Sequence, residues 1–372
     1  MGVDMQDARK CFGFVLFVLP PLLIMLYMNI IVDAGNVFHN PNEAVSKGIL
    51  SGNASYCSTG NFAEREVKRY LIENMPKNVG VLAFGPSLVM CVNSDIVGTD
   101  SFYNLGESAA DFYDILAQFR LLDLYQVKYQ KVILCVDSLF FNEKYYMQSG
   151  LRNEKLKPYA LDMISELQGR NERLPSKISL TISNTKYFLN RSVQVLSLSY
   201  LKANVQVLHK DSGILQKERY GIWDGTVDCS HYMPDASWVY NLDFQHRSVE
   251  EAVVKGCSSY DMDSVMWWPE GTHVSEHSKE IFMLLMKKLK EENIEVLLFL
   301  CPLPPSLWNR YDVEKRPFLP ELEEFVTKFS SDNGIPVTGS YNPYNLGIED
   351  KDFYDSRHVR RECLGHFFDF TL

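Results

Sequence analysis

A serine, an aspartate and a histidine stand where hydrolase-type chemistry could be built. Ser87 follows a short apolar run, residues 79–84, and a Gly-Pro pair, while Asp355 and His358 have D-x-x-H spacing near the C-terminus. In a Ser-His-Asp triad the histidine takes the serine proton, and the carboxylate orients the imidazole and stabilises its charged form. These residues predict acyl chemistry with Ser87 as nucleophile, His358 as base and Asp355 as its partner.

Ser87 also has a plain structural interpretation. Residues 88–96 have the pattern of a helix, and a serine at the start of a helix often caps it. The same place offers free backbone N–H groups and the positive end of a helix dipole, which suit an activated nucleophile. An Asp and a His three residues apart occur often by chance, so the two motifs support catalysis only where one fold joins them.

The elements that must position these residues have the pattern of a parallel sheet. Short apolar runs bounded by turn residues predict strands, and they lie at residues 79–84, 99–106, 131–141, 294–305 and 335–341. Amphipathic segments between and before them predict helices, at residues 63–75, 110–125, 278–293 and 321–334. The alternation indicates an α/β fold with a doubly wound parallel sheet covered on both faces. Ligand crevices of such sheets lie at the carboxyl ends of the strands, where Ser87, Gly106, Asp137 and residues 355–358 are expected to meet.

The composition is that of a globular protein, with 46% hydrophobic and 23% charged residues among 372. A net charge of −10 repels a phosphate backbone, so the sequence disfavours nucleic acid as a partner. The eight cysteines include no C-x-x-C pair, which disfavours a thiolate zinc site. Cys229 and Cys257 either pair, if that part lies outside the cytoplasm, or stay free.

The N-terminal region has a long uncharged stretch, residues 12–32, which suffices to cross a bilayer core of about 30 Å as a helix. Its length favours an uncleaved anchor over a signal peptide, since no small-x-small cleavage site follows. Arg9 and Lys10 precede it and Asp33 follows it, which predicts a cytoplasmic N-terminus and an extracytoplasmic catalytic domain. We therefore predict a cytoplasmic tail at residues 1–11 and a single-pass transmembrane anchor at residues 12–32. A stalk at residues 33–76 and the domain at residues 77–372 follow.

Residues 142–272 lack the strand–helix rhythm and contain an aromatic loop rich in Asp, Trp and His. We expect these residues to be an insert between the third and fourth strands that forms a lid or a substrate wall.

A zinc-peptidase alternative rests on residues 273–277, which match H-x-x-E-H. A metal site needs both histidines on one face of a formed helix. Thr272 and Ser275 look like cap residues, so His273 is expected to precede the helix. The sequence therefore predicts no metal and no cofactor.

Taken together, AFGPS, NLGES and FYDSRH resemble the motif blocks of the SGNH (GDSL-like) hydrolase superfamily. The resemblance covers residues 79–141 and 275–372 and leaves the insert out. It implies a flavodoxin-like fold and a triad of Ser87, His358 and Asp355. It also implies that the backbone N–H groups of Ser87 and Gly106 hold the oxyanion.

One motif block departs from the family pattern. Where simple esterases of the superfamily have Gly-x-Asn-Asp, this chain has CVDSL, residues 135–139, with no asparagine. The oxyanion site is therefore expected to lack its side-chain donor. This departure puts efficient free hydrolysis in doubt more than transfer.

The anchored, extracytoplasmic layout is similar to the branch of this superfamily that modifies cell-envelope polymers, such as the alginate O-acetylation proteins and the D-alanyl-lipoteichoic-acid transfer protein. The branch implies an O-acyltransferase, typically for acetyl, with a polysaccharide acceptor and a multi-pass membrane-bound O-acyltransferase as donor partner. Candidate substrate-binding residues are Asn104, Asp137 and Trp308. Further aromatics that would suit sugar faces are Tyr232, Trp238, Trp267 and Trp268. An extracytoplasmic carbohydrate esterase and a catalytically silent carbohydrate-binding or scaffold subunit of an export complex remain alternatives.

Overall fold

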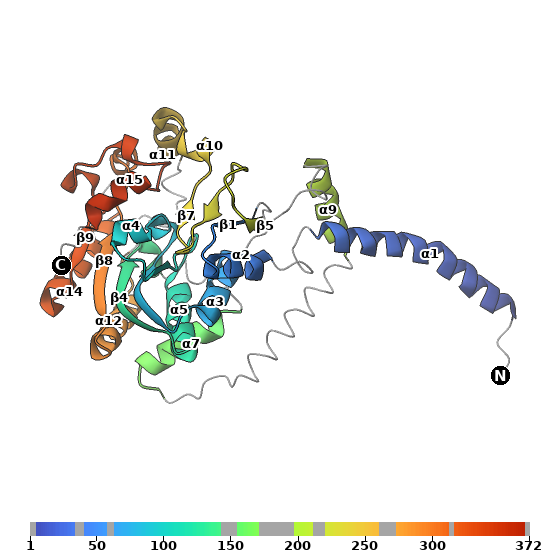
Figure 1. The fold of residues 1–372 in the computed structure, drawn as a ribbon, viewed down its shortest axis with the longest axis horizontal. Coiled ribbons are helices and arrows are strands. Elements are labelled where there is room, and N and C mark those ends of the chain that lie inside the picture. Colours follow the sequence, from blue (N-terminus) through green and yellow to red (C-terminus); the bar gives the residue numbers. More distant parts are fainter. Residues whose placement is uncertain are drawn as a thin grey trace.

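The computed structural model of the chain describes residues 5–33, 41–57, 63–142, 155–170, 197–210, 220–259, 273–311 and 316–368 (Figure 1). These residues form a five-stranded sheet in the order β3-β2-β4-β8-β9 and a four-stranded sheet in the order β5-β1-β6-β7.

The five-stranded sheet is parallel throughout. Its strands are β2 (Asn78–Phe84), β3 (Phe102–Asn104), β4 (Lys128–Cys135), β8 (Glu295–Leu300) and β9 (Val337–Gly339). Counted along the chain, they lie in the order 2-1-3-4-5, so the direction of winding reverses between β2 and β4. The predicted α/β fold with a parallel sheet is confirmed.

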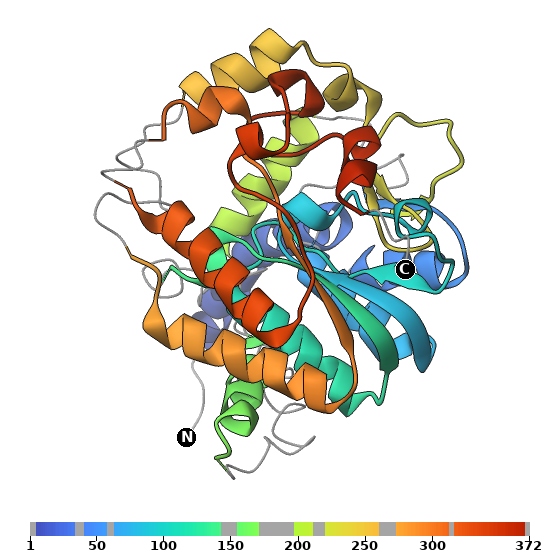
Figure 2. The ribbon, with the colours of Figure 1, turned by 90° about the vertical axis from the view of Figure 1, so that its left-hand side faces the viewer.

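Helices follow the strands as the amphipathic pattern predicts. The longer ones in the domain are α3 (Glu64–Asn74), α5 (Phe112–Leu124), α7 (Lys157–Leu167), α12 (Glu276–Glu291) and α14 (Phe318–Asn333). Figure 2 shows α12 and α14, in orange and red-orange, side by side over the sheet, where Phe282 and Phe325 pack 6.0 Å apart. Gly334 ends α14 in the left-handed conformation, with φ of 67°, as expected of a C-terminal glycine.

Shorter helical elements complete the described part. They are α10 (Leu242–Gln245), α11 (Lys255–Ser258), α13 (Pro305–Trp308), α15 (Arg361–Leu364), η2 (Ser138–Phe140), η3 (Glu250–Val254), η4 (Pro343–Asn345), η5 (Asp350–Asp352) and η6 (Gly365–Phe367).

The segment after Ser87 differs from the single helix predicted at residues 88–96. It forms a one-turn helix, η1 (Ser87–Val89), and a separate short helix, α4 (Ser94–Val97). Asn93 lies between them in an extended conformation, and its side chain accepts a hydrogen bond from Ile96 N–H. The helical pattern fails here because Asn93 starts a new helix instead of continuing the first.

Ser108 and Asp111 have the S-x-x-D spacing of a capping box, but the start of α5 is built differently. Asp111 is itself the N-cap, and its partner in the box is Asp114. The backbone N–H and hydroxyl of Ser108 donate instead to the carboxylate of Glu64 in α3. A tertiary contact therefore uses the serine that the local pattern assigns to a cap.

Residues 41–57 and 63–76, which belong to the predicted stalk, contain helices and a strand that pack in the hydrophobic core. Those residues form α2 (Pro41–Leu50), β1 (Ser55–Cys57) and α3. Val45 and Ile49 of α2 and Val67 and Leu71 of α3 are at most 1% exposed and belong to the hydrophobic core. Burial of their apolar faces makes these helices part of the domain.

The N-terminal helix α1 (Met5–Val32) contains the predicted anchor at residues 12–32 and packs on α9 (Leu198–Lys210) (Figure 1). Asn204 of α9 donates to Asn29 of α1 at 2.8 Å, and both side chains are buried. No helix in the described part of the chain is both long and apolar enough to cross a membrane. The predicted transmembrane anchor is therefore not confirmed.

The second sheet joins the early chain to the predicted insert. Its strands from the insert are β5 (Tyr220–Ile222), β6 (His231–Tyr232) and β7 (Trp238–Val239). β1 pairs antiparallel with both β5 and β6, and β6 pairs with β7. The β6–β7 hairpin is therefore fixed to the domain rather than loose above it.

Candidate active site

The structure brings Ser87, His358 and Asp355 together in one hydrogen-bonded line. The Nε2 atom of His358 lies 2.8 Å from Ser87 Oγ, and its Nδ1 atom lies 2.8 Å and 3.0 Å from the two carboxylate oxygens of Asp355. A proton on Nδ1 donated to Asp355 leaves Nε2 free to accept the serine proton. The arrangement is that of a Ser-His-Asp triad, assembled from residues 271 positions apart in the sequence.

A sharp turn after β2 presents Ser87. Gly85 has φ of 147°, which L side chains rarely adopt, and a Cβ atom there would lie 2.6 Å from Cys135 Cβ. The N-cap of η1 is Pro86, so the hydroxyl of Ser87 serves His358 rather than a cap. Among the described residues no acceptor takes the Ser87 N–H, which leaves that donor open at the nucleophile.

The loop of Asp355 and His358 is closed by a bridge between Phe353 and Val359. Asp355 Oδ1 also accepts from the N–H groups of Arg357 and His358, each at 2.8 Å. Burial alone would raise the pKa of Asp355, but the His358 ring and these N–H groups hold that pKa below its usual value. The carboxylate therefore stays charged beside the imidazole.

Gly106 and Asn104 lie beside the turn that presents Ser87, but their polar groups bond to other parts of the protein. Asn104 is fully buried, and its Nδ2 donates to the carbonyls of Val89 and Val92, each at 2.8 Å. Its Oδ1 accepts from Gly106 N–H at 2.8 Å. Every polar atom of the Asn104 side chain therefore bonds to backbone, and its predicted substrate contact stays a prediction.

The predicted oxyanion donor Gly106 is near the turn, since a Cβ atom there would lie 2.7 Å from Val89 Cγ1. Its N–H is engaged by Asn104 in this structure, whereas that of Ser87 is open. Of the two backbone N–H groups predicted to hold an oxyanion, that of Ser87 is therefore the one without a partner in the described part of the chain.

Asp137 also differs from its predicted role as a substrate contact. It is 3% exposed, and its Oδ1 accepts from Leu139 N–H at 2.8 Å as the cap of η2. Its Oδ2 lies 3.2 Å from the guanidinium of Arg357, between the two C-terminal triad residues. Asp137 thus ties the end of β4 to the triad loop.

The β6–β7 hairpin of the insert packs against the triad. Trp238 N–H donates to the Met90 carbonyl at 2.7 Å, and Arg361 donates to the Trp238 carbonyl at 2.7 Å. The Tyr240 ring lies 5.9 Å from the imidazole of His358, centroid to centroid. This part of the insert therefore lies beside Ser87 and His358, and the sequence did not single out Tyr240. Its predicted role as a lid or substrate wall stays a prediction.

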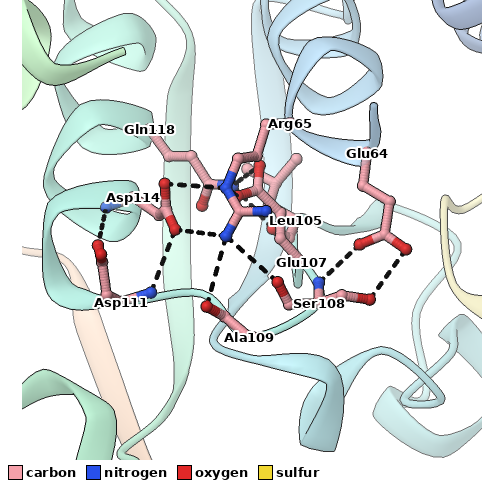
Figure 3. A network of polar contacts seen from close by, with 9 residues as sticks. All are labelled: Glu64, Arg65, Leu105, Glu107, Ser108, Ala109, Asp111, Asp114 and Gln118. Atoms are coloured by element: carbon pink, nitrogen blue, oxygen red, sulfur yellow. Dashed lines mark hydrogen bonds and ion pairs between the residues drawn. The ribbon is translucent and has the colours of Figure 1, made fainter. Parts of the chain in front are cut away.

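A buried ionic network connects α3 and α5 with the loop that follows β3 (Figure 3). Arg65 of α3 binds both carboxylate oxygens of Asp114 in α5, at 2.8 Å and 3.1 Å. Gln118 donates to Glu107 at 2.7 Å and to the Leu105 carbonyl at 2.9 Å. Burial, together with the charge of Asp114, raises the pKa of Glu107 to about 8. The network fixes the loop that follows β3.

Lys68 is a second buried cation at this loop, and the sequence prediction missed it. Its Nζ donates to the carbonyls of Asn104 at 2.7 Å and Ala236 at 2.9 Å. Burial lowers the pKa of Lys68 to about 8, against the opposing charges of nearby carboxylates. A signal existed, because Lys68 lies on the same helical face as Val67 and Leu71, where an apolar residue is expected.

Trp308 lines a separate cavity beside α14 and is not placed at the triad by any contact in the described part of the structure. Tyr232 is fully buried, and Trp238 packs on Tyr232 and Tyr240. Trp267 and Trp268 lie outside the described residues. Among the described aromatics of this set, Trp308 lines this cavity.

The described residues contain no group of three His, Cys, Asp or Glu side chains arranged to hold a metal ion. His273 precedes α12, whose N-cap is Ser275, and it pairs with Glu321 at 3.0 Å. The zinc-peptidase alternative is therefore not supported. Cys229 and Cys257 are both free, so the disulfide left open by the sequence does not form here.

No protein-family model matches the chain, and no curated protein matches it at a significant level. The resemblance to SGNH hydrolases therefore depends on the motif residues and on the geometry that the fold gives them.

Proposed function

We propose that the chain is a serine-dependent acyl-transfer enzyme of the SGNH type. One observation carries the proposal, namely the line of hydrogen bonds from Ser87 Oγ through His358 to Asp355. The strand order 2-1-3-4-5 supports it, because this is the order of flavodoxin-like sheets. Their ligands bind at the reversal point between the first and third strands, which β2 and β4 occupy here.

In the proposed reaction Ser87 Oγ attacks the carbonyl carbon of an ester donor while His358 Nε2 takes the hydroxyl proton. The oxyanion forms beside the open N–H of Ser87, and Asp355 stabilises the imidazolium. When the intermediate collapses, the bond to the leaving oxygen breaks and His358 returns the proton to it. His358 then takes the proton of an acceptor hydroxyl, whose oxygen displaces Ser87 from the acyl group.

The acceptor decides between transfer and hydrolysis. Asp137 stands where the family's third block has asparagine, and its carboxylate is bound to Arg357 and to backbone. With no amide donor at that place, free hydrolysis is expected to be slow, which favours transfer to a hydroxyl-bearing acceptor. We propose a polysaccharide as acceptor and an acetyl group as cargo. The membrane-bound donor partner and the extracytoplasmic location stay predictions from the sequence.

The test uses the full-length chain with a chromogenic acetyl ester, comparing wild type with Ser87→Ala. Wild type is expected to release the chromophore and to gain one acetyl mass, and the variant to do neither. Ser51→Ala is a matched control, because its hydroxyl is exposed and bonds only to the Lys47 carbonyl. A folded wild type without label or turnover would contradict the proposal and favour the silent subunit. Full turnover with no transfer to oligosaccharide would favour the esterase.

A further inference from the structure

A cavity of about 680 Å³ lies along α14, next to the segments that follow β8 and β9. Trp308, in the helix after β8, forms one part of its lining, and Asn342 and Asn345, in the segment after β9, form another. Thr327 and Ser331, one turn apart on α14, also line the cavity. Its volume is in the range of small-ligand sites, roughly 300–1,000 Å³.

Trp308 gives the cavity a flat aromatic surface. Its indole is half-buried and stacks on Tyr311, with ring centroids 5.6 Å apart and planes 14° apart. Within the described part of the chain, no hydrogen bond uses the indole N–H. The ring is therefore held by packing while its polar edge stays available.

The wall opposite α14 is fixed rather than loose. Glu323 of α14 accepts from Ser340 Oγ at 2.6 Å and from Tyr341 N–H at 3.1 Å. Asn345 in turn donates to Ser340 Oγ at 3.0 Å. These bonds hold η4 against α14, so the cavity exists before any ligand arrives, which lowers the ordering cost of binding.

The lining selects for a neutral, hydroxyl-rich ligand. It contains amides, hydroxyls and the three carboxylates of Glu323, Glu324 and Asp332, against the single ammonium of Lys328. This excess of negative charge repels polyanions. A pyranose ring places C–H groups against an aromatic face and directs hydroxyls to polar neighbours. We propose that this cavity, centred on Trp308, binds a neutral saccharide chain.

The cavity centred on Trp308, called the saccharide cavity below, is connected to the loop of Asp355 and His358 through one hydrogen bond and the chain that follows it. Ser306, two residues before Trp308, donates through its N–H to Asp350 at 2.9 Å. The chain then reaches the Phe353–Val359 bridge that encloses the triad loop. β8 lies two strands from β2, which separates their ends by about 10 Å in the sheet. Resting on the proposed function, the cavity is a remote subsite for the polysaccharide acceptor.

Calorimetric titration of the full-length chain tests the cavity directly. The ligands are a neutral glucose hexasaccharide and an oligouronate of equal length, and the proteins are wild type, Trp308→Ala and Trp308→Phe. We expect binding of the neutral chain, at least tenfold weaker binding in Trp308→Ala, and a smaller loss in Trp308→Phe. Trp223→Phe is the matched control, since Trp223 stacks on His231 and does not line the cavity.

Binding and catalysis are read separately, so either can fail alone. Ser87→Ala is expected to bind the hexasaccharide with wild-type affinity, whatever the outcome of the ester assay. Binding unchanged within twofold in a folded Trp308→Ala protein would overturn the proposal. So would tighter binding of the oligouronate, or no binding of the neutral chain at millimolar concentration. If Trp308→Ala unfolds, Trp308→Phe and Asn345→Ala decide by the same criterion.

Discussion

Replacement of Asn104 by alanine tests whether the hydrogen bonds of its side chain stabilise the segment that begins at Ser87. The side chain makes three buried bonds of 2.8 Å, to the Val89 and Val92 carbonyls and from the Gly106 N–H. Alanine leaves the Val92 carbonyl and the Gly106 N–H without these partners in the core, whereas the Val89 carbonyl keeps a bond from the Val92 N–H at 2.9 Å. At roughly 1–2 kcal/mol for each of the two unsatisfied buried groups, the expected loss of unfolding free energy is about 2–4 kcal/mol. This is a large part of the stability of a typical domain.

Urea denaturation followed by circular dichroism measures that loss, with Asn74→Ala as the control. Asn74 also donates to a backbone carbonyl, that of Tyr70 at 2.9 Å, but it is exposed. Water replaces the lost bond there, so the control is expected to change stability by no more than about 0.5 kcal/mol. The contrast isolates burial, because both variants remove an asparagine bound to backbone.

A loss below about 1 kcal/mol for Asn104→Ala would refute this account of Asn104. A second variant sharpens the test. Asn104→Asp keeps an oxygen for the Gly106 N–H but turns the donors toward Val89 and Val92 into acceptors. If those two donated bonds matter, Asn104→Asp must lose at least as much stability as alanine above the carboxyl pKa.

Three further changes have defined outcomes. Asp355→Asn is expected to lower kcat for a chromogenic ester by about 10³–10⁴, since the imidazole loses its orienting charge; a loss under tenfold would contradict the triad. Burial gives Glu107 a folded-state pKa of about 8 against an ordinary 4.5, so its contribution to stability is full below pH 4.5 and is lost as pH rises to 8. In the Glu107→Gln variant the fall of Tm between pH 4.5 and 8 should be smaller. An unchanged slope would show that other groups cause this pH dependence. Gly85→Ala should cost roughly 2–4 kcal/mol in thermal unfolding, because of its φ of 147° and the Cβ of Cys135 at 2.6 Å. Gly52→Ala, at φ of 78° with open space around it, is the control, and equal losses would show that contact with Cys135 adds nothing.

The proximity of Ser87, Asp355 and His358 could be predicted from the sequence, because apolar runs and turn residues mark where the strands end. The run before Ser87 has the length of a buried strand, and the Gly-Pro pair marks its end. Parallel strands bring their carboxyl ends to one edge, so Ser87 and the D-x-x-H pair can meet without any local signal of contact. The alternation of apolar runs with amphipathic segments was enough to predict the α/β sheet.

The polar residues beneath the triad could not be predicted in the same way. Asn104 and Asp137 also follow strand ends, and their residue types suit a substrate contact as well as a buried backbone bond. Which of the two occurs depends on whether neighbouring elements cover the side chain, and this is a tertiary property. For residues 41–57 and 63–76, burial of the apolar helix faces depended in the same way on packing of α2 and α3 against each other and of α3 against α5.

The number of hydrogen-bond donors near Ser87 affects how long an acyl-serine would persist. The open Ser87 N–H is one donor, while the Gly106 N–H is held by Asn104 and Asp137 offers none. Loss of one oxyanion donor costs about 10²–10³ in rate elsewhere. An activated ester acylates Ser87 readily despite this, because its leaving group departs easily, whereas water must attack an ordinary ester in the second step. The acyl-serine should therefore persist long enough to be detected by intact mass spectrometry. Transfer of the acyl group to a bound acceptor should be faster than its hydrolysis by water.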